Sequence, residues 1–222
     1  LIKGSRLMEK IVRRLASNIA RSQGLDAERE AVVAYGLLAM VQITVITLLA
    51  LALGFAVGAP VDALIVCFSV SFFRKYSGGA HAYDADFCTV VSVAYCTLAA
   101  AASGWLSPLY RLPAMLAAVI VFYATAYWVI YRYVPVDSPN KPIKNPLKIK
   151  RMRKGSFLLV TAYLALQLLF VFLGTRNPLF QGYGISLLLG VAWQTLTLTP
   201  IGAVLLNKLN DLPKFLRKEA HT

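Results

Sequence analysis

The chain has 222 residues, 58% of them hydrophobic and only 15% charged, with a mean hydropathy of +0.63. A soluble domain of this size could not keep so much apolar surface away from water, so the composition favours a membrane protein. The formal net charge of +13 does not indicate a nucleic-acid partner, because the basic residues flank apolar runs and no nucleic-acid-binding motif stands among them.

The first 30 residues predict a basic amphipathic helix on the membrane surface. Apolar Leu7, Ile11, Leu15 and Ile19 recur at helical spacing. The basic residues around them are Lys3, Arg6, Lys10, Arg13, Arg14, Arg21 and Arg29. Such a helix lies in the interface of an anionic membrane, so we expect anionic lipids as partners. A merely solvated helix is the alternative.

Six apolar segments follow, separated by Gly- and Pro-containing breaks. They cover residues 31–58, 61–73, 89–106, 112–134, 156–174 and 183–206. A helix needs about 20 apolar residues to cross a bilayer, and the short run 61–73 therefore fits a re-entrant or buried segment as well as a span. The predicted fold class is an all-α polytopic membrane helix bundle. We divide it into an interfacial segment (1–30), a transmembrane catalytic domain (31–206) and a basic cytoplasmic tail (207–222).

The placement of charge predicts the orientation. If both termini are cytoplasmic, only Arg111 and Arg176 of the 23 Lys and Arg residues lie outside. A bias this strong follows the positive-inside rule and favours an even number of crossings.

The three cysteines do not predict a disulfide framework or a metal site. Cys67 and Cys96 lie inside apolar runs, where a free cysteine usually behaves as a small hydrophobic residue. Cys88 instead follows a polar stretch that contains His81, one of only two histidines. One His and one Cys fall short of the usual four zinc ligands. We expect no metal and no cofactor.

His81 and Cys88 are the candidate base and nucleophile. A nucleophilic cysteine needs a base for its proton or a positive environment that favours the thiolate, and Arg74 and Lys75 add positive charge nearby. Residues seven apart on a straight helix lie about 10 Å apart along its axis, so the two can meet only across a bend. A structural cysteine beside an interfacial histidine is the alternative that the residues alone leave open.

The glycines and aspartates around the pair predict where that bend falls. Gly78-Gly79 supplies conformational freedom for a turn. Asp86 is a plausible N-cap that would place Cys88 in the first turn of the next helix, where the helix dipole favours a thiolate. Asp84 or Asp86 could orient His81.

The spacing of Arg74, Gly79, His81 and Cys88 resembles that of the accessory gene regulator B family, bacterial membrane endopeptidases that mature a quorum-sensing propeptide. The basic N-terminal segment, the six apolar segments, a Pro/Lys-rich loop at 139–146 and the basic tail also look like that family. The resemblance covers essentially the whole chain.

The resemblance implies that Cys88 attacks the propeptide with His81 as base, releases its C-terminal tail and keeps a thioester. A side chain of the bound propeptide then closes a thiolactone or lactone ring. It further implies that Gly79 lets substrate backbone approach and that Arg74 raises the local potential or holds an acidic group. We expect a propeptide with an amphipathic N-terminal helix and an acidic tail, a homodimer, and a bacterial plasma-membrane location with the site facing the cytoplasm. The rival hypothesis is a non-catalytic small membrane transporter or peptide-handling module.

Overall fold

The computed structural model describes residues 5–79, 85–136 and 145–219, with side chains for 10–79, 87–136 and 145–209. This part of the chain is all-helical, which confirms the predicted class. The helices are α1 (Ser5–Ser22), α2 (Ala27–Ala56), α3 (Pro60–Ser77), α4 (Ala85–Leu106), α5 (Leu112–Tyr133), α6 (Pro146–Gly174), α7 (Pro178–Thr197) and α8 (Pro200–Glu219). A short 3₁₀ turn, η1, covers Ser107–Leu109.

Local sequence signals set several of the helix starts. Side-chain oxygens of Asp26, Asn145 and Asn177 accept hydrogen bonds from backbone N–H groups in the first turns of α2, α6 and α7. Proline stands at the start of α3, α5, α6 and α7, where its missing N–H costs nothing and its fixed φ suits a helix.

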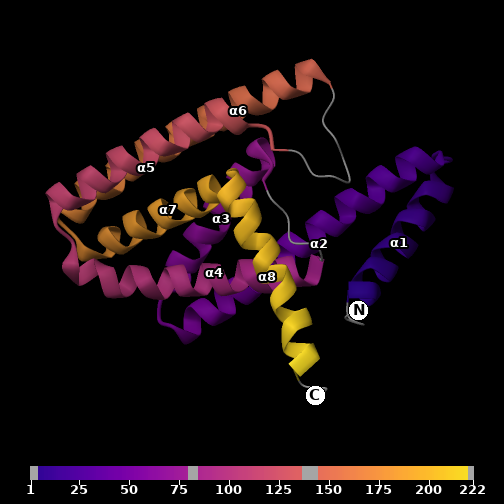
Figure 1. The fold of residues 1–222 in the computed structure, drawn as a ribbon, viewed down its shortest axis with the longest axis horizontal. Helices are drawn as coiled ribbons and strands as arrows, with labels where there is room; N and C mark the ends of the chain where they lie inside the picture. Colours follow the sequence, from indigo (N-terminus) through magenta and orange to yellow (C-terminus); the bar gives the residue numbers. More distant parts are fainter. Residues whose placement is uncertain (1–4, 80–84, 137–144, 220–222) are drawn as a thin grey trace.

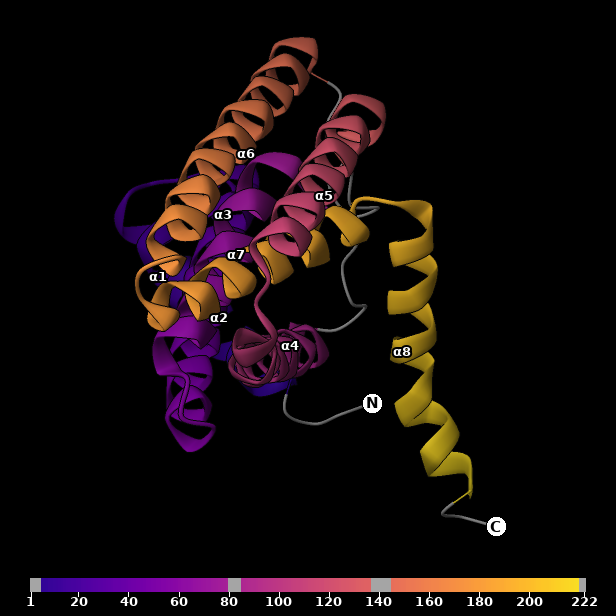
Figure 2. The same cartoon turned by 90° about the vertical axis from the view of Figure 1, so that its left-hand side faces the viewer.

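Helices α3 and α7 form the centre of the bundle (Figure 1). The α5–α6 hairpin packs along α7, and α2 and α4 pack on the other side of α3. Helix α1 folds back along the first part of α2, and the two project from the bundle. Helix α8 turns away from α7 by 91° and stands apart from the hairpin (Figure 2).

The short run 61–73 runs the full length of the bundle instead of dipping and returning. At the start of α3, Asp62 Oδ1 accepts hydrogen bonds from Ser103 Oγ (2.9 Å), near the end of α4, and from Ser186 Oγ (2.8 Å) on α7. At its other end, Ser77 O accepts from Val136 N (2.9 Å), just after α5. Helix α3 therefore joins the end that holds the α4–α5 turn to the end that holds the α5–α6 connection.

The surroundings of α3 explain how a short, partly polar helix can occupy this place. It packs against α2, α4, α6 and α7, and six of its residues are buried there, whereas Phe68 and Phe72 are exposed. Asp62 is half-buried, and the two serines supply hydrogen-bond donors to its carboxylate.

Four described helices are long and apolar enough to cross a membrane by themselves: α2, α4 with η1, α5 and α6. The bent pair of α7 and the described part of α8 could form a fifth span. The predicted run 183–206 is thus not one straight helix, because the chain bends between Thr197 and Pro200.

Two further boundaries differ from the sequence-based expectation. Helix α6 begins at Pro146, so the basic residues of 148–154 form its first turns rather than part of a loop. The predicted tail from residue 207 continues α8 as far as Glu219.

Helix α1 has one face buried against α2 and a neighbouring face that is exposed. Small residues Val12, Ala16 and Ala20 are buried against α2. The neighbouring row of Ile11, Leu15 and Ile19 is exposed, which leaves part of the predicted apolar face free.

Close packing of α3 on α7 depends on a glycine, and this gives the first prediction. A Cβ at Gly190 would collide with the Ser69 side chain and lie 3.4 Å from the Val66 carbonyl oxygen. We expect Gly190→Val to destabilise the folded protein by roughly 1–3 kcal/mol, the usual range for an overpacked core. Thermal melting in detergent measures the effect. The control is Gly36→Val, because Gly36 is exposed and a Cβ there meets nothing within 4 Å; equal losses in both variants would contradict the packing account.

Candidate functional site

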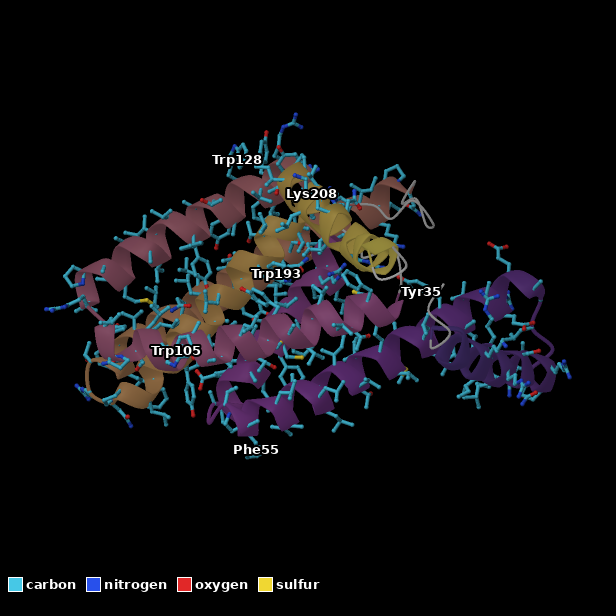
Figure 3. All side chains as sticks on the ribbon, turned by 60° about the horizontal axis from the view of Figure 1, so that its bottom comes forward. Tyr35, Phe55, Trp105, Trp128, Trp193 and Lys208 are labelled. Carbon is cyan, nitrogen blue, oxygen red and sulfur yellow. The ribbon has the colours of Figure 1, made fainter. Side chains whose placement is uncertain are left out.

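A small pocket lies where the end of α3, the start of α4 and the end of α7 meet, next to α8. Its lining residues are Arg74, Cys88, Val91, Ser92, Trp193, Thr197 and Leu206. Its volume is about 10 Å³, room for about one water molecule. Trp193 lies between α7 and α4 (Figure 3), where its ring stacks on Tyr95 with centroids 4.2 Å apart. The candidate nucleophile therefore faces a narrow pocket with both apolar and polar walls.

Cys88 lies in the first described turn of α4 and is half-buried. The unpaired N–H groups and the dipole at a helix start favour negative charge there. Helix α3 ends at Ser77 and α4 is described from Ala85, and position 81 lies between them, outside the described residues. The predicted cap is wrong: because α4 begins at Ala85, Asp86 is the second helical residue rather than the residue that precedes the helix.

Arg74 supplies positive charge to the same pocket. It lies in the last turn of α3, where a cation interacts favourably with the helix dipole. Its guanidinium is close enough to interact electrostatically with Cys88 and with Tyr35 of α2. Lys75 differs, because it is exposed and its ammonium lies 5.8 Å from the centre of the Tyr76 ring.

Gly78 and Gly79 form the predicted turn, with φ of +73° and +137°. Both values are readily adopted only by glycine. Gly78 forms an isolated parallel β-bridge with Val136. Gly79 is buried, and a Cβ on it would lie 3.1 Å from Gln194 Nε2 and 3.1 Å from Thr197 Oγ1. Gly79 thus permits a close approach to α7, and the approach of substrate that the family resemblance implies stays a prediction.

Three predicted site positions lie outside what the structure describes. His81 and Asp84 fall in the stretch 80–84, and Asp86 is described only through its backbone. Their roles stay predictions.

The other two cysteines lie deeper in the bundle. Cys67 on α3 and Cys96 on α4 are both buried in one apolar cluster with Ala50, Val66 and Ala99. Cys67 Sγ also lies 3.8 Å from Thr47 Oγ1. This setting is that of structural cysteines.

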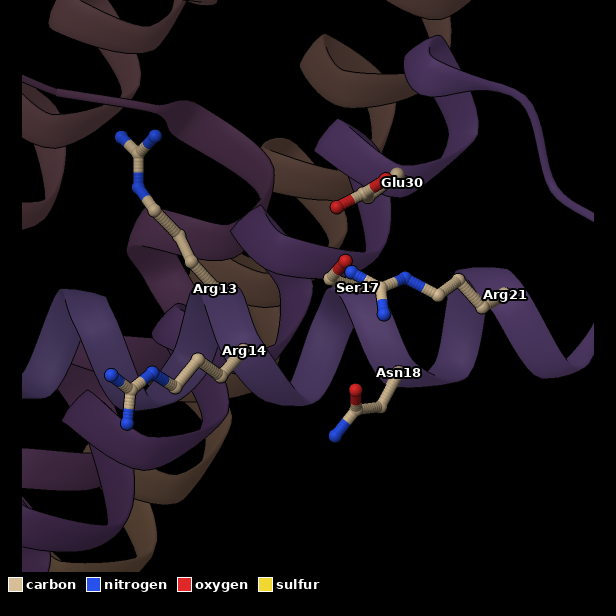
Figure 4. Close-up of a pocket in the computed structure, with 6 residues that line it drawn as sticks. All are labelled: Arg13, Arg14, Ser17, Asn18, Arg21 and Glu30. Atoms are coloured by element: carbon tan, nitrogen blue, oxygen red, sulfur yellow. The ribbon is translucent and has the colours of Figure 1, made fainter.

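A larger cavity, of about 400 Å³, lies between α1 and α2 (Figure 4). It is lined by Arg13, Arg14, Ser17, Asn18, Arg21 and Glu30. Three guanidinium groups on one helix suit an anionic surface.

Sequence reasoning missed the contribution of α7 to the site. Gln194 is fully buried, and its Nε2 donates to Gly78 O (2.8 Å) and to Ser77 Oγ (3.1 Å). Thr197 and Trp193 line the pocket beside Cys88. One signal could have found Gln194: a polar amide inside an apolar membrane run marks a functional or interhelical contact by default.

Comparison with known proteins gives a consistent family match. The family model described as Accessory gene regulator B matches residues 8–198. Two Clostridium perfringens proteins that carry the name AgrB-like protein are 32% and 31% identical, each over 92% of this chain and 97% of its own length. An AgrB-like protein of Halalkalibacterium halodurans is 25% identical over 97% of this chain and 98% of its own length. No solved structure matches the chain.

The differing environments of the three cysteines predict selective labelling. We expect iodoacetamide to modify Cys88 at least about tenfold faster than Cys67 or Cys96, because Cys88 is half-buried beside the positive charge of Arg74, whereas the other two thiols are buried in the bundle. Peptide mass mapping after timed labelling measures the three rates. Replacing Arg74 with Gln should slow Cys88 alone. Equal rates for all three cysteines would count against an activated thiol.

Proposed function

The chain belongs to the accessory gene regulator B family, which acts in quorum-sensing peptide processing, and from that premise we propose that it is a membrane cysteine endopeptidase. It cleaves the C-terminal tail from a propeptide through a thioester and passes the remaining peptide on as a cyclic thiolactone or lactone. One observation carries this proposal: Cys88 and Arg74 line the same small pocket, with Cys88 in the first turn of α4.

In the first step, Cys88 Sγ attacks the carbonyl carbon of the scissile peptide bond. His81 takes the thiol proton and then protonates the leaving amine, so the C–N bond breaks as the C–S bond forms. Negative charge develops first on sulfur and then on the carbonyl oxygen. The Arg74 guanidinium, which is close enough to Cys88 to interact with it electrostatically, would stabilise such charge, and backbone N–H groups at the start of α4 would add to this.

In the second step, a Cys or Ser side chain of the bound peptide attacks the thioester. Its proton passes through His81 to Cys88 Sγ, the ring closes, and the enzyme is regenerated. Exchange of a thioester with a thiol is nearly neutral in free energy, so the main competing reaction is hydrolysis. A pocket of about 10 Å³, walled in part by Val91, Trp193 and Leu206, leaves little room for water and supports transfer over hydrolysis.

Basic residues surround the same end of the bundle. The Gly78–Val136 bridge places the turn after α3 next to the α5–α6 connection. Arg153, in the first turns of α6, donates from Nε to Val134 O (2.9 Å), so the basic start of α6 belongs to this end as well. This grouping supports an acidic substrate tail and, by the positive-inside rule, a site that faces the cytoplasm of a bacterial plasma membrane.

Helix α1 supports attachment to anionic lipid. Its exposed apolar row lies beside arginines that line the cavity in Figure 4. That combination suits the interface of an anionic bilayer, where enzyme and a membrane-bound propeptide share one surface at raised effective concentration. The homodimer expected from the family resemblance stays a prediction.

Co-expression with a candidate propeptide tests the function. We expect Cys88→Ala and His81→Ala each to reduce release of the C-terminal tail by at least about 10³-fold, because the nucleophile and its base act as a unit. Mass spectrometry of the peptide products measures the loss. Cys96→Ala is the matched control, since it removes a buried thiol from the same helix, and it should cleave normally.

Normal cleavage by Cys88→Ala would reject the endopeptidase and favour the rival transporter or peptide-handling module. The same reaction in vesicles tests the lipid partner: Arg13→Gln with Arg14→Gln should slow cleavage on anionic vesicles and have little effect on neutral ones. An equal effect on both vesicle types would contradict the lipid proposal.

A further inference from the structure

The turn that follows α3 is held from two sides. On one side, Val136 N donates to Ser77 O (2.9 Å), and Val136 pairs with Gly78. On the other side is α7. There Gln194 Nε2 reaches both Ser77 Oγ (3.1 Å) and Gly78 O (2.8 Å). The backbone of this turn therefore has little freedom to shift relative to the bundle.

Gln194 is the only one of these partners that contacts the turn through a side-chain amide. Burying such an amide costs free energy unless its polar atoms are hydrogen-bonded. Gln194 is fully buried, and its Oε1 has no hydrogen-bond partner among the described residues, while its Nε2 donates to the turn. Thr197, three residues further along the same face of α7, lies against Gly79 on one side and lines the Cys88 pocket on the other.

The short distance along the chain between Gly79 and His81 connects this turn to the base. Consecutive Cα atoms are about 3.8 Å apart, so the Cα of His81 lies within roughly 7–8 Å of the Cα of Gly79. Whatever fixes Gly79 also limits where the imidazole can be. A displacement of about 1 Å in a reacting group can lower a rate about 100-fold.

We propose that Gln194 is a positioning residue of the active site: its side-chain amide holds the Gly78–Gly79 turn against α7, and this sets the reach of His81 to Cys88. The inference rests on the proposed Cys/His function and adds a residue that acts through the base, without touching substrate.

The chain offers a close control. Gln167 on α6 is also fully buried and also donates Nε2 to a glycine carbonyl (Gly184 O, 3.1 Å). Its Oε1 likewise has no hydrogen-bond partner in the described part of the chain. Gly184 precedes Gln194 by ten residues on α7, about 15 Å along the helix. Gln167→Leu therefore reports the effect of losing a buried amide far from the site.

The experiment compares Gln194→Leu with Gln167→Leu in purified full-length protein. We expect both to lower the melting temperature to a similar extent. Only Gln194→Leu should slow Cys88 alkylation by iodoacetamide and lower kcat for propeptide cleavage, each by about 10- to 100-fold, with KM within about twofold. If Gln194→Leu fails to fold, Gln194→Asn serves instead, because its shorter amide keeps the polarity but cannot span both acceptors.

A double-mutant cycle separates positioning from general disturbance. In a His81→Ala background, Gln194→Leu should cause no further slowing of Cys88 alkylation, because its effect passes through the imidazole. Full additivity of the two changes would overturn the proposal, as would equal effects of Gln194→Leu and Gln167→Leu. A His81→Ala variant that is alkylated as fast as wild type would instead reject the Cys/His pair itself, and with it this inference.

Discussion

Helix α3 can cross the whole bundle only because its two polar ends find partners inside the protein. At one end Asp62 receives two serine hydroxyls, and at the other the Ser77–Gly79 backbone is bonded to Val136 and Gln194. Unpaired, such groups would cost several kcal/mol each in an apolar medium. These hydrogen bonds fix the position of the Gly78–Gly79 turn after α3. Arg74 lies one helical turn earlier and consequently faces the start of α4.

Because the turn after α3 is fixed, a site with few functional groups can still be arranged for catalysis. Cys88 gains the dipole of α4 and the charge of Arg74, while α7 and α8 close its pocket with Trp193, Thr197 and Leu206. A narrow pocket limits the water that could hydrolyse a thioester, and the basic end of the bundle surrounds it with positive charge. The same elements that stabilise the fold therefore also favour acyl transfer to a second nucleophile.

Much of the fold could be predicted because hydrophobic runs and their Gly/Pro breaks are local signals. The helix that contains Cys88 was predictable for the same reason. The sequence also carries a signal for the bend at Thr197–Pro200, where threonines and a proline interrupt the apolar run, but the angle of 91° depends on packing. The role of α7 in the site was not predictable, since Gln194 and Gly78 are far apart in the chain and their hydrogen bond depends on packing. Gly79 shows the same limit: the sequence indicated a close approach, and only the structure identifies α7 as the neighbour.

The central claim is that Cys88 carries the peptide as a thioester, and one measurement addresses it directly. A propeptide whose ring-forming Cys or Ser is replaced by Ala can complete the first step but not the second. Intact mass spectrometry of the enzyme, quenched soon after mixing, should show an adduct on Cys88 with the mass of the peptide's N-terminal part less one water. Hydroxylamine should remove this adduct. Release of the C-terminal tail with no adduct on Cys88 would contradict the account.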